Sequence, residues 1–379
     1  MKRKKVLIVY ATAGIGHKKA ALAVKKAFDE LNPAEAEASM IDALDYTNAF
    51  FKWIYLKVYL LMVNRLPLLW GALYYFTDNP LINFIVAPMR RMNNHLNSGK
   101  FRKFLTQMKP DVVICTHFFA TEVIADMKEK GALKTHLITV VTDYKLHAWW
   151  IEDGVDTYVV GGDDAGNDLL RWKVPAEKIK VLGIPVEPVF SKALDREKAL
   201  KAAGLKEGVF TVLVIGGGFG VGPIEEIVKA IGSVSKPVQA IAICGHNEHL
   251  ARRLEELKKR FSATVKVLGF VDNVYDYMEV SDILISKSGG ITVSESLAKE
   301  LPMIVIAPII GQETRNSDYL ASNRAALKLD KAEDLKGVLE GLASDPSKAE
   351  ALKEAVRRIR KPRACYDVAR LAIDFCAGN

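Results

Sequence analysis

A pair of glycines, Gly289 and Gly290, stands where a buried strand is followed by a helix. The apolar run Ile283–Ile285 predicts the strand, and helix-forming residues in helical register predict a helix that begins near Thr292. Glycines let a phosphate approach backbone N–H groups closely, and the start of a helix adds the positive end of its dipole. The segment therefore predicts an anion site, with a plain helix cap as the alternative.

Two charged residues flank this turn. Lys287 places a cation before it, and Glu295 lies about one turn into the predicted helix. The Glu295 carboxylate could accept hydrogen bonds from the two hydroxyls of a ribose. Phosphate and ribose groups together predict a nucleotide ligand, whereas an ordinary first-turn carboxylate is the alternative for Glu295.

A histidine follows a second glycine turn, in the segment Ala11–His17 after the strand predicted at Lys5–Tyr10. The dinucleotide fingerprint G-x-G-x-x-G/A does not fit, because Lys19 occupies the position of its last small residue. At the carboxyl end of a parallel strand, His17 could act as a general base with a pKa near the working pH. The alternative is a histidine whose pKa is lowered by the helix start without any catalytic purpose.

A polar and aromatic cluster, Thr142–Trp150, follows the strand predicted at His136–Val141. Asp143 could orient His17 or share a proton with it, and His147 and the tryptophans could line an acceptor cleft. The alternative is an Asx-type turn with buried aromatic residues that fill a domain interface.

Further loops with glycine or polar residues follow strands in the second half of the chain. Loops at the carboxyl ends of parallel strands would converge on one ligand. Gln312 and Glu313 carry groups that could bind sugar hydroxyls, or they could cap the following helix. The loops are Gly216–Gly220, Gly269–Val271 and Gly311–Asn316.

Strands alternate with helices along nearly the whole chain, which predicts an α/β fold with doubly wound sheets. A chain of 379 residues is too long for one core, so two domains are expected. The predicted domains are residues 1–186, residues 187–355, and a C-terminal helical segment, 356–379, that packs back on the first. The predicted strands are Lys5–Tyr10, Asp111–Cys115, His136–Val141 and Thr157–Val160 in the first domain, and Phe210–Ile215, Val238–Cys244, Thr264–Val267, Ile283–Ile285 and Met303–Ile306 in the second.

The segment of residues 45–104 interrupts this alternation with many aromatic, aliphatic and basic residues. It contains no apolar run of the roughly 18–20 residues that a membrane-spanning helix needs. Its composition predicts amphipathic insertions that lie on an anionic bilayer, and the alternative is helices that cover the sheet or form a dimer interface. The net charge of +8 also favours an anionic partner. No CxxC pair or zinc-type histidine spacing occurs, which indicates free thiols in a reducing cytoplasm.

In combination, the motifs resemble the family 28 glycosyltransferases. The resemblance rests on VKVLGFVDNVYDYM, SDILISKSGGITVSESLA, LPMIVIAP and GQETRN in the second half, and on the GxGH turn and the TDYxxHxxW string in the first half. Within the family, the chain is most similar to the branch of monogalactosyldiacylglycerol synthases and processive diacylglycerol glucosyltransferases. Arg315 departs from the pattern, because other members often have an acidic residue there.

The resemblance implies a GT-B fold, with two Rossmann-like domains that face an interdomain crevice. It implies an inverting transfer of a hexose from a UDP-sugar to diacylglycerol at the membrane surface, which makes a β-glycosyl-diacylglycerol. His17 would be the base, with Asp143 in support, and Gly16, His147 and Trp150 would bind the acceptor. The implied donor site consists of Gly218, Phe270 at the uracil, Lys287, Gly289, Gly290, Ile291 and Thr292 at the diphosphate, Glu295 at the ribose, and Gln312 and Glu313 at the hexose.

The expected partners are UDP-glucose or UDP-galactose, diacylglycerol and an anionic membrane surface, with no nucleic acid. No metal or other cofactor is expected, since the chain has no D-x-D string. The expected location is the cytoplasm, peripherally associated with the inner face of the cell membrane. The alternatives are a UDP-N-acetylglucosamine-dependent transferase that acts on a lipid-linked peptidoglycan precursor, a UDP-sugar epimerase, and a non-catalytic membrane-binding module.

Overall fold

The computed structural model describes residues 3–12, 14–217 and 222–378. It divides into two compact units, which we call the first unit and the second unit. The first unit comprises residues 1–188, 309–315 and 363–379, and the second comprises residues 189–308 and 316–362. Sequence analysis placed the corresponding boundaries after residues 186 and 355, and it assigned no part of residues 309–315 to the first domain.

The first unit contains a six-stranded parallel sheet in the order β2-β1-β3-β4-β5-β6. From β1 the chain goes outward to β2 and then returns to β3 on the other side, so the strand order reverses between β1 and β3. The strands β2 and β6 were not predicted, because β2 contains no continuous apolar run and β6 has only two residues. The strands are β1 (Lys4–Tyr10), β2 (Ala36–Asp42), β3 (Val112–Cys115), β4 (His136–Val140), β5 (Thr157–Val159) and β6 (Ile179–Lys180).

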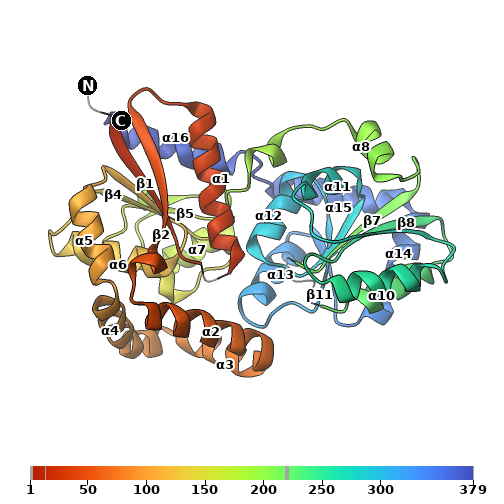
Figure 1. The fold of residues 1–379 in the computed structure, drawn as a ribbon, viewed down its shortest axis with the longest axis horizontal. Coiled ribbons are helices and arrows are strands. Elements are labelled where there is room, and N and C mark those ends of the chain that lie inside the picture. Colours follow the sequence, from red (N-terminus) through yellow and green to blue (C-terminus); the bar gives the residue numbers. More distant parts are fainter. Residues whose placement is uncertain (1–2, 13, 218–221, 379) are drawn as a thin grey trace. The chain divides into compact units, whose positions relative to one another are not determined.

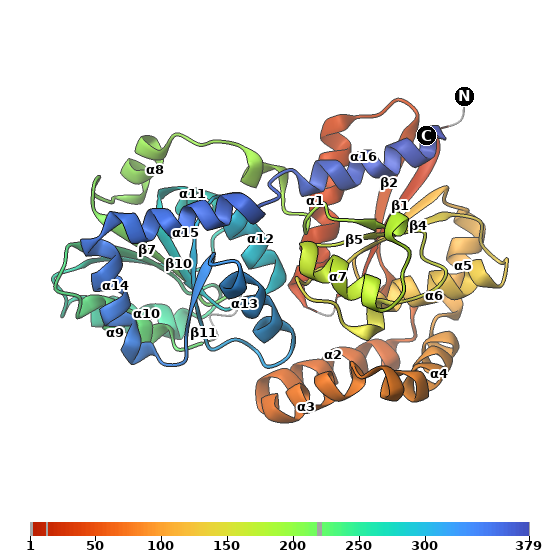
Figure 2. The same cartoon turned by 180° about the vertical axis from the view of Figure 1, so that it is seen from behind.

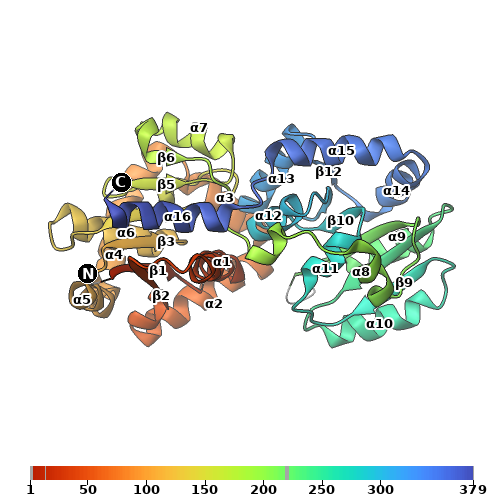
Figure 3. The same ribbon diagram turned by 90° about the horizontal axis from the view of Figure 1, so that it is seen from above.

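Helices cover both faces of this sheet. On one face, α1 (Ile15–Leu31) packs against α16 (Ala364–Ala377), and the two helices run side by side over the strands (Figures 1 and 3). The Tyr366 hydroxyl donates a hydrogen bond to Glu30 and joins them. The other elements of the unit include α5 (Gly99–Met108), α6 (Phe118–Glu129), α7 (Asp163–Arg171), and the short 3-10 helices η1 (Ala43–Tyr46), η2 (Ala148–Trp150) and η3 (Ala176–Lys178).

The aromatic and basic segment folds into three helices that lie apart from the sheet, α2 (Ala49–Arg65), α3 (Pro67–Thr77) and α4 (Pro80–Asn97) (Figures 1 and 2). Asparagines start two of them, since the Asn48 side chain accepts from the Phe51 N–H at 2.7 Å and the Asn79 side chain accepts from the Leu81 N–H at 3.0 Å. Among the described residues, none of the helices combines the length and the hydrophobicity that a membrane span requires.

The second unit repeats the parallel arrangement, with the order β12-β11-β10-β7-β8-β9 and a reversal between β7 and β10. Its apolar core lies between the sheet and helices that include α9, α10 and α14. The strands are β7 (Phe210–Ile215), β8 (Val238–Ile243), β9 (Thr264–Leu268), β10 (Ile283–Ser286), β11 (Met303–Ile306) and β12 (Ala326–Leu329). The helices are α8 (Arg196–Ala203), α9 (Ile224–Gly232), α10 (Glu248–Lys258), α11 (Val274–Val280), α12 (Gly290–Ala298), α13 (Gln312–Ser322), α14 (Leu335–Ser344) and α15 (Pro346–Ile359), with η4 (Pro188–Ser191) and η5 (Ala332–Asp334).

Candidate active site

The reversal of strand order in the first unit brings two histidines together. In open parallel sheets, ligands bind beyond the carboxyl ends of the strands at such a reversal. His17 lies in the first turn of α1, which follows β1, and His117 follows β3, the neighbouring strand. Gly14 precedes α1 with a φ of 97°, a left-handed conformation that favours glycine and turns the chain into the helix. The residues that directly follow β1 and β3 thus lie together at the carboxyl edge of the first sheet.

The hydrogen bonds of His17 fix its tautomer. Its Nδ1 lies 2.7 Å from the Thr116 carbonyl oxygen and 3.0 Å from the Thr142 hydroxyl. Because a carbonyl oxygen can only accept, the proton of the neutral ring is on Nδ1, and Nε2 carries a lone pair. The expectation of a pKa near the working pH was wrong, because burial lowers the pKa of His17 to about 4, although the bond to Thr116 acts in the opposite direction. His17 is therefore neutral at pH 7, and its Nε2 can accept a hydrogen bond or a proton.

Sequence analysis missed His117, which is buried beside His17. The two ring centroids lie 4.5 Å apart in an edge-on arrangement. The His117 Nδ1 accepts a hydrogen bond from the Phe119 N–H at 3.0 Å and so caps the start of α6. Burial, assisted by the neighbouring His17, holds the pKa of His117 well below its usual value. Its place after β3 was the one signal in the sequence, and no motif around it added to that signal.

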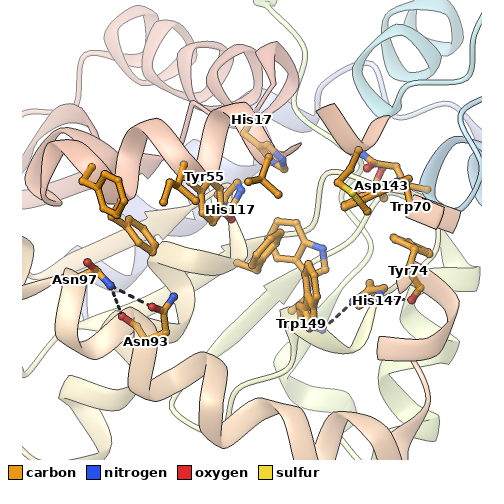
Figure 4. A pocket seen from close by; sticks show the side chains of 18 residues that line it. His17, Tyr55, Trp70, Tyr74, Asn93, Asn97, His117, Asp143, His147 and Trp149 are labelled. Atoms are coloured by element: carbon orange, nitrogen blue, oxygen red, sulfur yellow. Dashed lines mark hydrogen bonds between the residues drawn. The ribbon is translucent and has the colours of Figure 1, made fainter. Parts of the chain in front are cut away.

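A pocket of about 510 Å³ opens beside the two histidines. Its size lies within the usual range for small-molecule sites, and aromatic and aliphatic side chains form most of its wall. Figure 4 shows His17 and His117 close together, with Tyr55 near them and Trp149, His147 and Tyr74 further along the pocket. The lining residues are His17, Phe50, Phe51, Ile54, Tyr55, Val58, Met62, Trp70, Tyr74, Asn93, Asn97, His117, Phe118, Asp143, His147, Trp149, Trp150 and Gln312.

The predicted base partner Asp143 and two of the residues predicted to bind the acceptor, His147 and Trp150, line this pocket. Asp143 is buried and accepts a hydrogen bond from the Gln312 side chain at 3.3 Å, while the contacts to the Nδ1 of His17 come from its neighbour Thr142 and from Thr116. Trp150 is buried, with its ring centroid 6.2 Å from that of His17. Gly16 immediately precedes His17 in α1.

His147 uses both ring nitrogens within the protein. Its Nδ1 accepts from the Trp149 N–H at 3.2 Å, so its Nε2–H donates to the Tyr74 carbonyl at 3.0 Å. Burial lowers its pKa to about 4. These hydrogen bonds connect α3 to η2. Because both ring nitrogens are used, His147 can contact an acceptor substrate only through the carbon atoms and the face of its ring.

In the second unit, the reversal of strand order lies beside the predicted anion site. The helix α12 begins at Gly290, with Gly289 as its N-cap, so the prediction of a start near Thr292 was two residues late. Gly289 has a φ of −62°, which any residue can adopt, so what glycine contributes here is the missing side chain. No side chain among the described residues caps this helix end, and the N–H groups of Gly290, Ile291 and Thr292 are left for a ligand.

The other residues predicted to bind the UDP-sugar donor follow the strands of the same sheet. Lys287 is half-buried and lies directly before this helix start, and Glu295 is buried on α12. Phe270 follows β9 with 60% of its surface exposed, and its ring stacks on His246 at a centroid distance of 4.4 Å. Sequence analysis missed His246, which follows β8. Gly218 lies outside the described residues.

The two residues predicted to bind the hexose, Gln312 and Glu313, begin the helix α13, which follows the loop after β11. The Glu313 side chain is buried, and one of its carboxylate oxygens accepts from the Ile309 N–H at 2.8 Å, which closes the loop before α13. Arg315 donates to the Leu146 carbonyl at 2.9 Å and pairs with Asp78 at 2.5 Å. This arginine therefore anchors residues 309–315 to other segments of the first unit.

The two halves of the chain match two family models. The family model described as monogalactosyldiacylglycerol (MGDG) synthase matches residues 17–186, and the glycosyltransferase family 28 C-terminal domain matches residues 211–365. A processive diacylglycerol beta-glucosyltransferase of Bacillus cereus (strain B4264) is 29% identical, with 96% of this chain and 91% of that protein covered. Its counterpart in Staphylococcus epidermidis is 27% identical, with 98% and 92% covered.

Solved structures show the same fold at low sequence identity. Acinetobacter baumannii MurG has a TM-score of 0.67 at 16% identity, with 98% of this chain and 99% of that chain covered. S. aureus MnaA, solved with UDP, has a TM-score of 0.63 at 12% identity, with 99% and 97% covered. These likenesses identify the fold as GT-B. The chain is a glycosyltransferase that belongs to family 28, in the branch whose first domain matches monogalactosyldiacylglycerol synthase.

Proposed function

We propose that this chain transfers a hexose from UDP-glucose or UDP-galactose to diacylglycerol, with inversion, and so makes a β-glycosyl-diacylglycerol. The observation that carries the proposal is the Nε2 lone pair of His17 at a pocket walled mainly by aromatic and aliphatic side chains. An apolar acceptor with one hydroxyl suits both features. The relatives named as diacylglycerol beta-glucosyltransferases support the same acceptor.

The reaction is a single displacement. The His17 Nε2 takes the proton of the acceptor hydroxyl as that oxygen attacks the anomeric carbon, and the bond between the anomeric carbon and the UDP oxygen breaks. The Thr116 carbonyl accepts from Nδ1–H and stabilises the imidazolium that forms. A positioned base of this kind contributes about 100- to 10,000-fold to the rate. Asp143 lines the same pocket and is proposed to support the base.

The donor is proposed to bind on the second sheet. The free N–H groups at the start of α12, together with Lys287, would hold the diphosphate and stabilise the departing UDP. Glu295 would accept from the ribose, Phe270 would contact the uracil, and Gln312 and Glu313 would hold the hexose. The transfer is proposed to require no metal ion.

The helices α2, α3 and α4 are proposed to bring the pocket to a lipid surface. Leu68, Leu81 and Phe84 on these helices each have more than three quarters of their surface exposed. Apolar side chains of this kind, next to basic residues such as Lys57 and Arg65, suit the boundary of an anionic bilayer. The inner face of the cell membrane, approached from the cytoplasm, is the proposed location.

Product analysis tests the proposal. The purified chain is incubated with diacylglycerol in anionic vesicles and with UDP-glucose, UDP-galactose or UDP-N-acetylglucosamine in turn, and lipid products are identified by mass spectrometry. A hexosyl-diacylglycerol supports the proposal and names the sugar. Transfer only from UDP-N-acetylglucosamine, or epimerised UDP-sugar without glycolipid, would refute it.

A further inference from the structure

The two neutral imidazoles beside the pocket have opposite tautomers. His17 is protonated on Nδ1, so its Nε2 accepts. In His117 the Nδ1 accepts from the Phe119 N–H, and a backbone N–H can only donate, so the proton of this ring is on Nε2. The ring centroids lie 4.5 Å apart and both residues line the same pocket, so a hydrogen-bond acceptor on His17 and a hydrogen-bond donor on His117 belong to neighbouring side chains of its wall.

The Nε2–H group of His117 is available to donate a hydrogen bond to a ligand. His117 lines the pocket with only 1% of its surface exposed. Its Nε2 makes no hydrogen bond to any residue that the structure describes, and its nearest ring neighbour is Phe118, at a centroid distance of 4.2 Å. A ligand that shields this N–H from water without accepting from it would leave it unpaired, which is costly, so a ligand with an acceptor atom at this place would gain by pairing with it. Burial keeps His117 neutral, which preserves this tautomer.

We propose that the His117 Nε2–H donates to the carbonyl oxygen of the ester next to the reacting hydroxyl, and so selects glycerolipids acylated at position 2. This inference rests on the proposed function. The terminal hydroxyl of diacylglycerol donates to His17, and the ester on the adjacent carbon supplies a carbonyl oxygen, which is a strong acceptor. An ether oxygen at the same position lacks that carbonyl. His117 is thus a specificity-determining residue and takes no proton in the transfer.

His117→Asn is the informative variant. Asparagine is among the preferred N-cap residues, so it can keep the bond to the Phe119 N–H and the start of α6. Its shorter side chain cannot place a donor where Nε2 stands. A melting temperature and a UDP affinity equal to those of the unchanged chain establish that the variant is folded.

The test uses two synthetic acceptors of equal chain length, 1-O-alkyl-2-acylglycerol and 1-acyl-2-O-alkylglycerol. We expect the unchanged chain to favour the 2-acyl compound by about 5- to 100-fold in kcat/KM, the range for leaving a buried donor unpaired. We expect His117→Asn to lower kcat/KM for the 2-acyl compound and to use both compounds about equally.

Two results would overturn the inference while leaving the proposed function intact. One is equal use of the two acceptors by the unchanged chain, and the other is an unchanged preference in His117→Asn. Failure of the unchanged chain to glycosylate these compounds and diacylglycerol would instead refute the proposed function, and the inference with it.

Discussion

His17 owes its proposed role to a backbone group. The Thr116 carbonyl, at the end of β3, fixes the Nδ1 proton and leaves Nε2 as the acceptor. A side-chain substitution at Thr116 would not remove this main-chain oxygen. The pairing of β1 with β3 therefore determines the Nδ1–H tautomer of His17. Burial then keeps the ring neutral, which is the form a base requires.

Removing the His17 imidazole should abolish most turnover and leave binding of the UDP-sugar donor unchanged. For His17→Ala we expect kcat to fall about 100- to 10,000-fold, because the base is lost. We expect the Kd for UDP, measured by calorimetry, to change less than about twofold, since the proposed UDP contacts lie on the second sheet. His249→Ala, an exposed histidine on α10, is the control and should keep full activity. Wild-type kcat in His17→Ala would contradict the assignment.

The pH profile should reveal the lowered pKa. Since the base works only when neutral, and since its pKa is about 4, kcat/KM should stay level as the pH falls from 7 to about 5 and then decline toward 4. A histidine with the usual pKa of 6.5 would give a decline near that pH. Initial rates over this range, with unfolding monitored at each pH, distinguish the two cases. A decline centred near 6.5 would contradict the assigned environment of His17.

At the scale of elements, buried charges attach the helical insertion to the first unit. Arg90 on α4 lies between two buried carboxylates, with its Nε 2.7 Å from Glu122 and its Nη2 3.1 Å from Glu152. Arg91 adds a 2.5 Å ion pair to Glu152, and Asn94 donates to Glu122 at 2.8 Å. This network holds α4 against α6, and α4 in turn holds one side of the pocket.

Arg90→Met should destabilise the protein strongly. The substitution leaves two buried carboxylates with fewer partners, and breaking a buried pair costs about 3–5 kcal/mol of unfolding free energy. Lys52→Met removes the surface ion pair with Asp45 and should cost less than about 1 kcal/mol. Urea unfolding, followed by tryptophan fluorescence, measures both. A loss below about 1 kcal/mol for Arg90→Met would show that the network contributes little.

Prediction of the strands from the sequence depended on how continuous the apolar residues of each strand are. The buried strands β7 and β11 are apolar runs, and their predicted ends agree with the structure. β2 was missed because the exposed polar residues Glu37 and Ser39 interrupt its apolar residues. The glycine turn and His17 were identified by their place after strands. His117 and His246 were missed because nothing in their local sequence distinguishes them, and their significance comes from ring contacts with His17 and Phe270.

At the scale of the whole molecule, a basic chain combines with an exposed apolar surface. The net charge is +8, and the exposed apolar residues of α2, α3 and α4 include Leu68, Leu81 and Phe84. Charge would attract the chain to an anionic bilayer, and burial of the apolar side chains would hold it there. Attraction by charge weakens as salt rises, whereas apolar burial does not.

Leu81→Asp with Phe84→Asp should weaken membrane binding. Each large apolar side chain contributes about 1.5–3 kcal/mol when fully buried, so we expect at least tenfold weaker binding to phosphatidylglycerol vesicles in sedimentation assays. Leu170→Asp, at an exposed position on α7, is the control and should bind as the unchanged chain does. Equal binding by all three proteins would remove α4 from the proposed membrane surface.

The anomeric configuration of the product tests the central claim most directly. UDP-glucose and UDP-galactose carry their sugar in the α configuration, and one displacement by a hydroxyl activated at His17 must invert it. We predict that proton NMR of the glycolipid formed from diacylglycerol will show a β linkage. An α-linked glycolipid would contradict the mechanism, because it requires either two displacements or attack from the face that UDP leaves.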